Sequence, residues 1–421
     1  MPEDQTFVIV GAGLTGAKAA ETLREEGFAG RIVLLGHEPD RPYERPPLSK
    51  GYLLGKEPRE NAYVHEARWY DEHRVELRTG VRAVRVATAG QFVILDNGED
   101  LRYDKLLLAT GAEPRPLAVT GADLDGVLYL RRFPDSDRIK AALRESARLL
   151  VVGAGWIGLE VAAAARLAGA EVTVVELADL PLQQVLGNEV AAIFADVHRQ
   201  HGVDLRMQTG VQELRGVVGV QSAVLTDGDE LPVDAVVVGI GVAPANDLAE
   251  TAGLKLENGI IADEYLRTSA PDVYAAGDVA NAYHPLIGRR IRVEHWANAL
   301  NSGPAAARSM LGQDVPYDAV PYFYTDQYDA YPSIGMEYSG YVGPEGYDQV
   351  IIRGDATIRT DANPEFIAFW VKQGRVLAGM NVNVWDVTEP IQALVRAGYG
   401  GRTVDLARLA DPEVPLDDLL R

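Results

Sequence analysis

Three glycines recur with one spacing at two places in the chain. The sets are Gly11, Gly13 and Gly16 in FVIVGAGLTGAKAAETL, and Gly153, Gly155 and Gly158 in LLVVGAGWIGLEVAAAARL. Between a strand and a helix, such glycines allow a tight turn, close approach of a pyrophosphate, and close helix packing. The N-terminus of the following helix then faces the phosphates. Because the pattern occurs twice, the sequence predicts two dinucleotide-binding halves rather than a chance glycine-rich turn.

An acidic residue follows the second glycine set at the spacing of a ribose ligand. The strand EVTVVE ends at Glu176, roughly 20 residues past the first glycine. Its carboxylate would accept a hydrogen bond from the adenine-ribose 2′-hydroxyl and repel a 2′-phosphate. Residues 177–197 contain no lysine or arginine, so NADH is favoured over NADPH.

The first half offers two candidates for the same role. Its strand RIVLLGHEPD ends with His37 and Glu38. Either Glu38 or a ring nitrogen of His37 contacts the ribose, and His37 is equally well explained as an exposed loop residue.

The elements around these motifs indicate an α/β protein. Strand-like runs alternate with alanine-rich helical stretches, as in βαβ units on parallel sheets. Each half closes with an aspartate and an apolar strand, YDKLLLATGAEPR and VDAVVVGIGVAPAN. The chain is expected to leave the first domain after residue 112 and to return at 246, because YAAGDVA from Tyr274 continues a nucleotide-site pattern. After Pro321, alternating aromatic segments predict antiparallel strands that turn at Gln373-Gly374.

The amino-acid composition excludes several classes of site and partner. With 47% hydrophobic and 24% charged residues the chain is typical of a folded protein. It has no cysteine, which excludes thiolate metal sites, disulfides and a redox-active dithiol, and no metal is expected. A net charge of −21 argues against nucleic acid as a partner. The acidic start MPEDQTFVIV and the absence of a long apolar run predict a cytoplasmic protein.

Several further blocks resemble one family. They are PYERPPLSK, LLLATGAEPR, GAGWIGLEVAA, VYAAGDVA, RVEHWANA and PYFYTDQYD. Together they resemble the FAD-dependent NADH:ferredoxin reductases of bacterial oxygenase systems, which are related to apoptosis-inducing factor. The resemblance implies two Rossmann-type domains arranged as in glutathione reductase: an FAD-binding domain over 1–112 and 246–320, an NAD-binding domain over 113–245, and a smaller α+β C-terminal domain over 321–421.

The resemblance also implies roles for individual residues. Lys50 approaches flavin N5 and pairs with Glu160, which is placed on the first turn of its helix. Arg45 serves the FAD phosphates or adenine, and Asp278 accepts a hydrogen bond from the ribityl chain. Glu294, His295 and Trp296 begin a helix that faces the flavin pyrimidine, although His295 is also explained as structural. The other residues expected to contact FAD or NADH are Leu14, Thr15, Val81, Ala109, Thr110, Gly111, Arg131, Trp156, Ile157, Gly241, Gly277 and Tyr324.

One position departs from the family pattern. Tyr324 stands where relatives usually have a tryptophan beside the flavin, and it is either a stacking partner or a core aromatic. The segment 330–340 is longer than usual, which affects partner geometry.

The implied activity is transfer of hydride from NADH to FAD, followed by single-electron transfer to a small acidic [2Fe-2S] ferredoxin that serves a cytochrome P450 or a ring-hydroxylating oxygenase. Arg289, Arg290 and Arg292 form either its docking patch or a solvated loop. A monomer or weak homodimer is expected. The alternative is a redox-sensing flavoprotein resembling apoptosis-inducing factor. Without cysteine, the mechanisms of NADH oxidases and peroxidases are excluded.

Overall fold

The computed structural model describes residues 4–420, and the chain forms two compact units. The first contains the described residues up to Glu44 together with Arg59–Glu113 and Ala243–Pro321. The second contains Arg45–Pro58, Pro114–Val242 and the residues from Tyr322 onward. The predicted three-domain boundaries stay a prediction.

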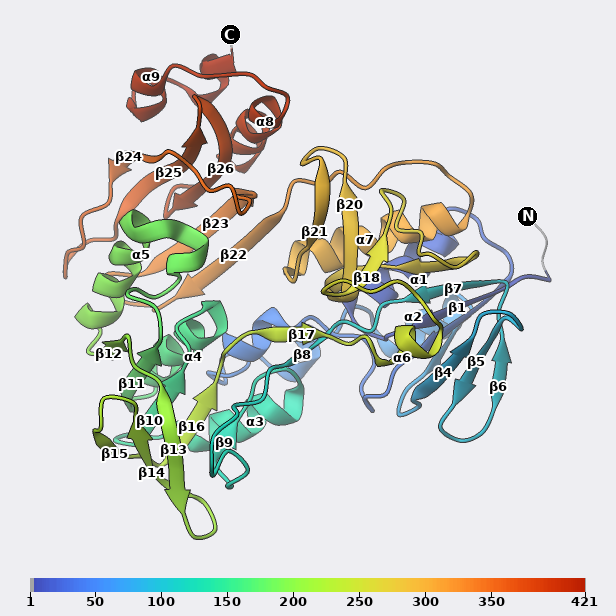
Figure 1. Cartoon of the computed structure of the whole chain (residues 1–421), viewed down its shortest axis with the longest axis horizontal. Helices are drawn as coiled ribbons and strands as arrows, with labels where there is room; N and C mark the ends of the chain where they lie inside the picture. The colour runs from blue at the N-terminus through green and yellow to red at the C-terminus, as the bar shows by residue number, and fades with distance from the viewer. Residues whose placement is uncertain (1–3, 421) are drawn as a thin grey trace. The chain divides into compact units, whose positions relative to one another are not determined.

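A parallel five-stranded sheet forms the centre of the first unit (Figure 1). Its order is β19-β7-β1-β2-β3, with β19 (Val273–Ala275), β7 (Lys105–Leu108), β1 (Thr6–Val10), β2 (Arg31–Leu35) and β3 (Val75–Arg78). Apart from β3, the strands are mostly apolar and buried, as expected where helices or a second sheet cover both faces. Because β1 is central, the turn that follows it opens at the point where strand order reverses, which is where ligands bind in such sheets.

Smaller elements complete the first unit. They are α1 (Leu14–Glu25), η2 (Arg59–Ala62), α2 (Ala67–Glu72), α6 (Asp247–Thr251), η3 (Gly277–Val279) and α7 (Trp296–Met310), an antiparallel sheet of β4 (Ala83–Ala87), β5 (Phe92–Leu95) and β6 (Asp100–Arg102), and a sheet of β18 (Ile260–Ala262), β20 (Ala280–His284) and β21 (Arg289–Arg292). Helices α1 and α7 pack closely against each other.

The second unit repeats the parallel sheet with the same spatial order for four of its strands, whereas its fifth strand, β9, precedes the others in sequence and β19 follows those of the first unit. Its order is β12-β11-β10-β16-β9, with β12 (Asp204–Met207), β11 (Glu171–Glu176), β10 (Arg148–Val152), β16 (Ala235–Val238) and β9 (Val127–Leu128). Strand β10 corresponds to β1, and each is followed by a glycine turn and a helix. This repeat is the physical basis of the two sequence fingerprints, and the predicted α/β class is confirmed.

The helices and hairpins of this half complete the repeat. They are η1 (Pro46–Ser49), α3 (Phe133–Ala142), α4 (Trp156–Leu167), α5 (Gln183–Gln200), and the antiparallel strands β13 (Val211–Gly216), β14 (Val220–Leu225) and β15 (Glu230–Pro232). The two connections between the units, β8 (Ala112–Pro114) and β17 (Val242–Pro244), pair with each other.

The C-terminal part of the second unit is an antiparallel sheet covered by a helix (Figure 1). Its order is β22-β23-β26-β25-β24, with β22 (Tyr322–Gln327), β23 (Ile334–Gly340), β26 (Arg375–Val382), β25 (Glu365–Lys372) and β24 (Gln349–Asp355). Helix α8 (Thr388–Tyr399) packs on β23 and β26, and α9 (Leu406–Ala410) and η4 (Leu416–Leu420) follow. The turn between β25 and β26 falls at Gln373-Gly374, as the sequence predicted.

One core joins this sheet to the helices of the repeat. Phe323 and Trp370 belong to the same buried cluster as residues of α4 and α5. The indole nitrogen of Trp370 also donates a hydrogen bond of 3.0 Å to the carbonyl of Leu186. Among residues 4–420, no helix is long and apolar enough to cross a membrane.

The contact between α1 and α7 yields a first prediction. A Cβ on Gly303 would lie 2.3 Å from the carbonyl oxygen of Thr15. Helix propensity alone favours alanine over glycine by roughly 1 kcal/mol, but forcing the helices apart costs about 1–3 kcal/mol. Gly303→Ala is therefore expected to lower the melting temperature in a thermal scan. The exposed Asn301→Ala on the same helix is the control, and an equal or higher melting temperature for Gly303→Ala would contradict the packing argument.

Candidate functional site

In the first glycine turn, the fold requires glycine at two of the three positions but not at the third. Gly11 has φ +119°, and a Cβ there would lie 2.0 Å from the carbonyl oxygen of Ala109. A Cβ on Gly16 would lie 2.1 Å from the carbonyl oxygen of Gly11. Gly13, by contrast, has φ −95°, which any residue can adopt, and no described atom lies within 4 Å of a Cβ built there.

The open space at Gly13 lies at the N-terminus of α1. Gly13 is the N-cap residue, and no side chain in the described part of the chain caps this helix. The first-turn N–H groups and the positive end of the helix dipole can therefore receive an anion. These features fit the pyrophosphate of a dinucleotide such as FAD.

The second glycine turn has the same construction. Gly153 has φ +99°, and a Cβ on Gly158 would lie 2.1 Å from its carbonyl oxygen. Gly155 is the N-cap of α4, with open space at its Cβ position and no cap from any described side chain. Trp156 and Ile157 begin the helix, and the Trp156 ring packs against Phe323. This turn fits the pyrophosphate of NADH.

The predicted ribose carboxylate lies beside the second turn. Glu176 accepts hydrogen bonds from the backbone N–H of Ala154 at 2.8 Å and of Ala178 at 3.1 Å. The side chain is thus fixed next to the glycine loop, where an adenine ribose would be read. Gly241, which follows strand β16, has φ +90°, and its carbonyl accepts a hydrogen bond of 2.9 Å from the N–H of Arg115.

In the first unit, the structure distinguishes the two candidates after β2. Glu38 is half-buried and accepts a hydrogen bond of 2.5 Å from the Tyr43 hydroxyl, whereas His37 is exposed. Tyr43 was not predicted, although it lies within PYERPPLSK. Val81 lies beside this segment and donates its N–H to the carbonyl of Gly36 at 3.0 Å. Which of the two side chains contacts a ribose stays a prediction.

Other predicted FAD residues of the first unit surround the first glycine turn. A Cβ on Gly277, φ +74°, would lie 2.6 Å from the Thr15 hydroxyl oxygen. The N–H of Gly277 is held by the Ser302 hydroxyl at 3.0 Å, a contact that the sequence did not reveal. Ala109, Thr110 and Gly111 follow β7, and the Thr110 hydroxyl donates to the carbonyl of Ala245 at 2.9 Å.

The start of α7 corrects one expectation. The helix begins at Trp296, with His295 as its N-cap residue, so Glu294 precedes it. Burial lowers the pKa of His295 to about 4, against a smaller opposing effect of the Asp278 charge, and the ring is neutral near pH 7. The Trp296 indole donates to Glu44 at 3.2 Å, and burial raises the pKa of that carboxyl.

The arginines expected to form a docking patch are also placed differently. All three lie on strand β21 rather than in a loop. The Arg292 side chain is only 9% exposed and forms an ion pair of 2.5 Å with Glu294. Arg292 therefore does not contribute to a free positive surface, while Arg290 is exposed.

The second unit brings the predicted catalytic pair together. Lys50 Nζ lies 2.5 Å from Glu160 Oε1, and the Glu160 side chain is only 4% exposed. Glu160 also accepts hydrogen bonds from the Thr325 hydroxyl, at 2.5 Å, and from the Ser49 hydroxyl. Glu160 is the fifth residue of α4, one position past the first turn where it was expected. Ser49 and Thr325 were missed by the sequence analysis.

One further predicted residue, Tyr324, lies near this pair. The Lys50 ammonium is 5.6 Å from the centroid of the Tyr324 ring. Burial raises the pKa of the neighbouring Asp326, and the Lys50 charge partly opposes this. Arg45, the N-cap of η1, donates a hydrogen bond to the carbonyl of Arg131. Lys50, Glu160 and Tyr324 therefore form one polar cluster in this unit.

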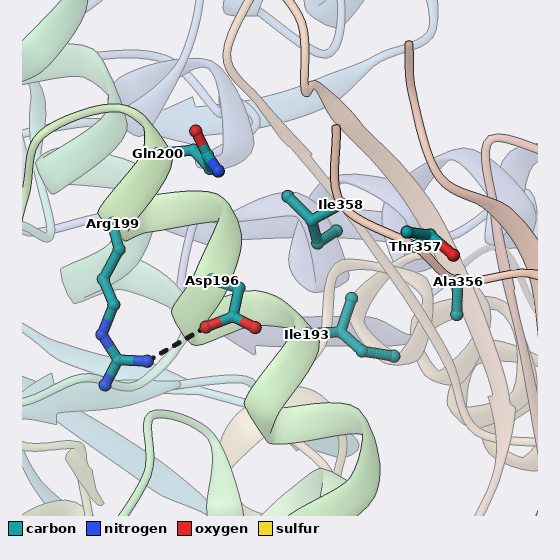
Figure 2. A pocket seen from close by; sticks show the side chains of 7 residues that line it. All are labelled: Ile193, Asp196, Arg199, Gln200, Ala356, Thr357 and Ile358. Carbon is teal, nitrogen blue, oxygen red and sulfur yellow. Dashed lines mark hydrogen bonds and ion pairs between the residues drawn. The ribbon is translucent and has the colours of Figure 1, made fainter. Parts of the chain in front are cut away.

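A separate cleft of about 600 Å³ lies elsewhere in the second unit. Figure 2 shows its lining side chains, from α5 and from the chain after β24: Ile193, Asp196, Arg199, Gln200, Ala356, Thr357 and Ile358. Its one arginine forms an ion pair of 3.1 Å with Asp196. None of the predicted site residues lines this cleft.

Comparison with known proteins gives the family. Residues 5–303 match the model of the pyridine nucleotide-disulphide oxidoreductase family, and residues 322–420 match the reductase C-terminal family. The chain belongs to the pyridine nucleotide-disulphide oxidoreductases. The resemblance found in the sequence is thereby confirmed, as are the enzyme class of a flavoprotein ferredoxin reductase and the cofactors FAD and NADH.

Similar family members align over most or all of their length. The rhodocoxin reductase of Rhodococcus erythropolis is 41% identical over 83% of this chain and 81% of its own. The ferredoxin–NAD(+) reductase component of the anthranilate 1,2-dioxygenase system of Burkholderia cepacia is 38% identical over 98% and 99%. The crystal structure of the covalent putidaredoxin reductase–putidaredoxin complex matches with a TM-score of 0.92 at 36% identity, covering 100% of this chain and 99% of that one.

The two kinds of glycine give a matched pair of variants. Gly13→Val is expected to leave the folded apoprotein about as stable as wild type, because its Cβ meets open space, but to fill the space above the uncapped helix and abolish flavin binding. Gly11→Ala is expected to destabilise the fold by several kcal/mol, because of its φ and the clash with Ala109. Flavin content and apoprotein melting temperature separate the two effects, and normal flavin content in Gly13→Val would reject this site.

Proposed function

We propose that the protein is an NADH:ferredoxin oxidoreductase that supplies electrons to a small acidic [2Fe-2S] ferredoxin of a cytochrome P450 or ring-hydroxylating oxygenase system. Bound FAD would supply the chemistry, by accepting hydride from NADH and releasing electrons one at a time. A cytoplasmic location and a monomer or weak homodimer go with the proposal as expectations.

One observation carries the proposal above the others: the buried ion pair of Lys50 and Glu160. A desolvated pair with hydrogen bonds from Ser49 and Thr325 is a rigid polar group that needs no reorganisation when a substrate binds. Its proposed role is to orient the nicotinamide and exclude water beside the flavin. The chain has no cysteine, so no dithiol takes part.

The remaining residues are assigned binding roles. The uncapped starts of α1 and α4 hold the two pyrophosphates, and Glu176 selects NADH by its charge. The N-terminus of α7, with neutral His295 at its cap, presents the positive end of the helix dipole to a developing negative charge. Tyr324, close to Lys50, covers the flavin on the proposed partner side.

The function is tested by stopped-flow absorbance of the purified flavoprotein. Mixing with NADH is expected to bleach the flavin far faster than mixing with NADPH, and a two-iron ferredoxin added afterwards is expected to reoxidise it promptly. Slow bleaching with a persistent charge-transfer band would contradict the reductase proposal and support the redox-sensing alternative.

The role of the ion pair is tested with Glu160→Ala. Removing the carboxylate leaves the Lys50 charge without its partner and takes away the group proposed to orient the nicotinamide. We expect the limiting rate of flavin reduction to fall roughly 10- to 100-fold. Replacement of the exposed Glu171 by alanine, on the same unit, serves as control. An unchanged rate in Glu160→Ala removes this residue from the mechanism.

Coenzyme preference is tested with Glu176→Gln. The amide keeps an acceptor for the N–H of Ala154 but removes the charge that would repel a 2′-phosphate. The ratio of kcat/KM for NADH to that for NADPH is expected to fall about tenfold, the effect of ~1.4 kcal/mol, mainly through a lower KM for NADPH. An unchanged ratio would show that discrimination lies elsewhere.

A further inference from the structure

A second polar cluster, in the same unit, is connected to the Lys50–Glu160 pair through Thr325. In β22 the side chains of Thr325 and Gln327 point to one face because successive residues of a strand alternate, and both are buried. His198, in the last turn of α5, is fully buried beside them. Together with Tyr328 these residues form a connected set of hydrogen bonds that ends on Glu160.

The contacts follow one another without a break. The Tyr328 hydroxyl lies 2.8 Å from His198 Nδ1, and His198 Nε2 lies 2.9 Å from Gln327 Oε1. Gln327 Nε2 lies 3.4 Å from the Thr325 hydroxyl, the longest link. The Thr325 hydroxyl lies 2.5 Å from Glu160 Oε1. A buried path of side chains thus connects α5 to the carboxylate.

The chemistry of the donors gives this path a direction. Burial lowers the pKa of His198 to about 4, so near pH 7 the ring carries a single N–H. Because Nε2 faces the Gln327 oxygen, the proton belongs on Nε2, and Nδ1 accepts from Tyr328. Gln327 then presents its amide nitrogen to Thr325.

The orientation of Gln327 decides what Thr325 can do. A threonine hydroxyl has one proton to donate and can also accept. While the Gln327 amide donates to it, that proton is free for Glu160. If Gln327 were reversed, its oxygen would face Thr325 and compete with Glu160 for the same proton.

We propose that His198 is a positioning residue for flavin reduction, which holds the Gln327 amide so that Thr325 donates its only hydroxyl proton to Glu160. The inference rests on the role of Glu160 given under the proposed function. His198 itself touches none of the reacting groups that the proposal names and acts through two intervening side chains.

His201 and a neighbouring loop keep the far end of the path in place. The His201 ring stacks on the Tyr328 ring at 3.5 Å between centroids and 7° between planes. His201 Nε2 lies 2.8 Å from the carbonyl of Pro332. Tyr328 is thereby fixed, and burial raises the pKa of its hydroxyl, which keeps it a donor to His198.

Three replacements of His198 separate positioning from packing. His198→Gln places an amide where Nε2 stands and keeps the donor to Gln327. His198→Asn places its polar atoms where Nδ1 stands, so it keeps a partner for Tyr328 but does not reach Gln327. His198→Leu removes both contacts. We expect the limiting rate of flavin reduction by NADH to fall roughly tenfold in the Asn and Leu variants, the loss expected for one hydrogen bond to a charged group, with unchanged Kd for NADH. The Gln variant is expected to stay near wild type.

A double-mutant cycle identifies the route. In a Thr325→Val background, where the last link is gone, His198→Leu is expected to cause no further loss of rate. Additive losses, or a Gln variant as slow as the Leu variant, overturn the proposal. If His198→Leu fails to fold with flavin, Gln327→Leu replaces it in the same cycle with the same expected outcome.

A spectroscopic measurement tests the proposal without a measurement of activity. In wild-type protein with ¹⁵N-labelled histidine, nitrogen NMR between pH 6 and 8 is expected to show His198 neutral, with the proton on Nε2 and a bare Nδ1. A proton on Nδ1 overturns the proposal. If NADH failed to reduce the flavin of the wild-type protein, the proposed function would be rejected. The NMR measurement would still test the direction of the hydrogen bonds, because it does not depend on activity.

Discussion

Glu160 carries its carboxylate at a position where only 4% of the side chain reaches solvent. Moving such a group out of water costs several kcal/mol unless an opposite charge and hydrogen bonds replace the lost hydration. Here the replacement comes from Lys50 and Ser49, at the end of η1, and from Thr325 in β22. Three segments far apart in the sequence must therefore meet at one carboxylate. Residues 45–58, α4 and the C-terminal sheet belong to the same compact unit, in which these three segments meet.

Other contacts hold the same three segments at the positions that the carboxylate needs. The Ser136 hydroxyl of α3 donates to the carbonyl of Leu48 at 2.8 Å, which fixes η1. Phe323, two residues before Thr325 in β22, packs against Trp156 at the start of α4. Apolar contact of this kind brings the strand to the helix, and the polar groups then select one arrangement. Packing supplies most of the stability, and the hydrogen bonds supply the geometry.

The sequence was informative where structure is determined locally. Apolar runs and glycine turns predicted both parallel sheets and the turn at Gln373-Gly374, because strand burial and positive φ are properties of a few adjacent residues. The Lys50–Glu160 pair came from family resemblance, since nothing local relates residues so distant in sequence. Ser49 and Thr325 were missed because their role depends on which face of η1 and β22 meets α4. Alternation in YFYTDQ places Phe323, Thr325 and Gln327 together, but only tertiary packing decides the direction in which that face points.

The same limit applies to charge, and it bears on how a partner is recognised. Three arginines looked equivalent in the sequence, yet Arg292 is turned inward onto Glu294. Elsewhere, arginines such as Arg148 and Arg206 are paired with nearby aspartates, so much of the positive charge is neutralised within the chain. With a net charge of −21, the chain as a whole would repel the proposed acidic ferredoxin, and physiological salt screens that repulsion beyond about 8–10 Å. Recognition of such a partner must then depend on short-range complementarity, in which a few correctly placed donors and aromatic contacts matter more than the total charge of either protein.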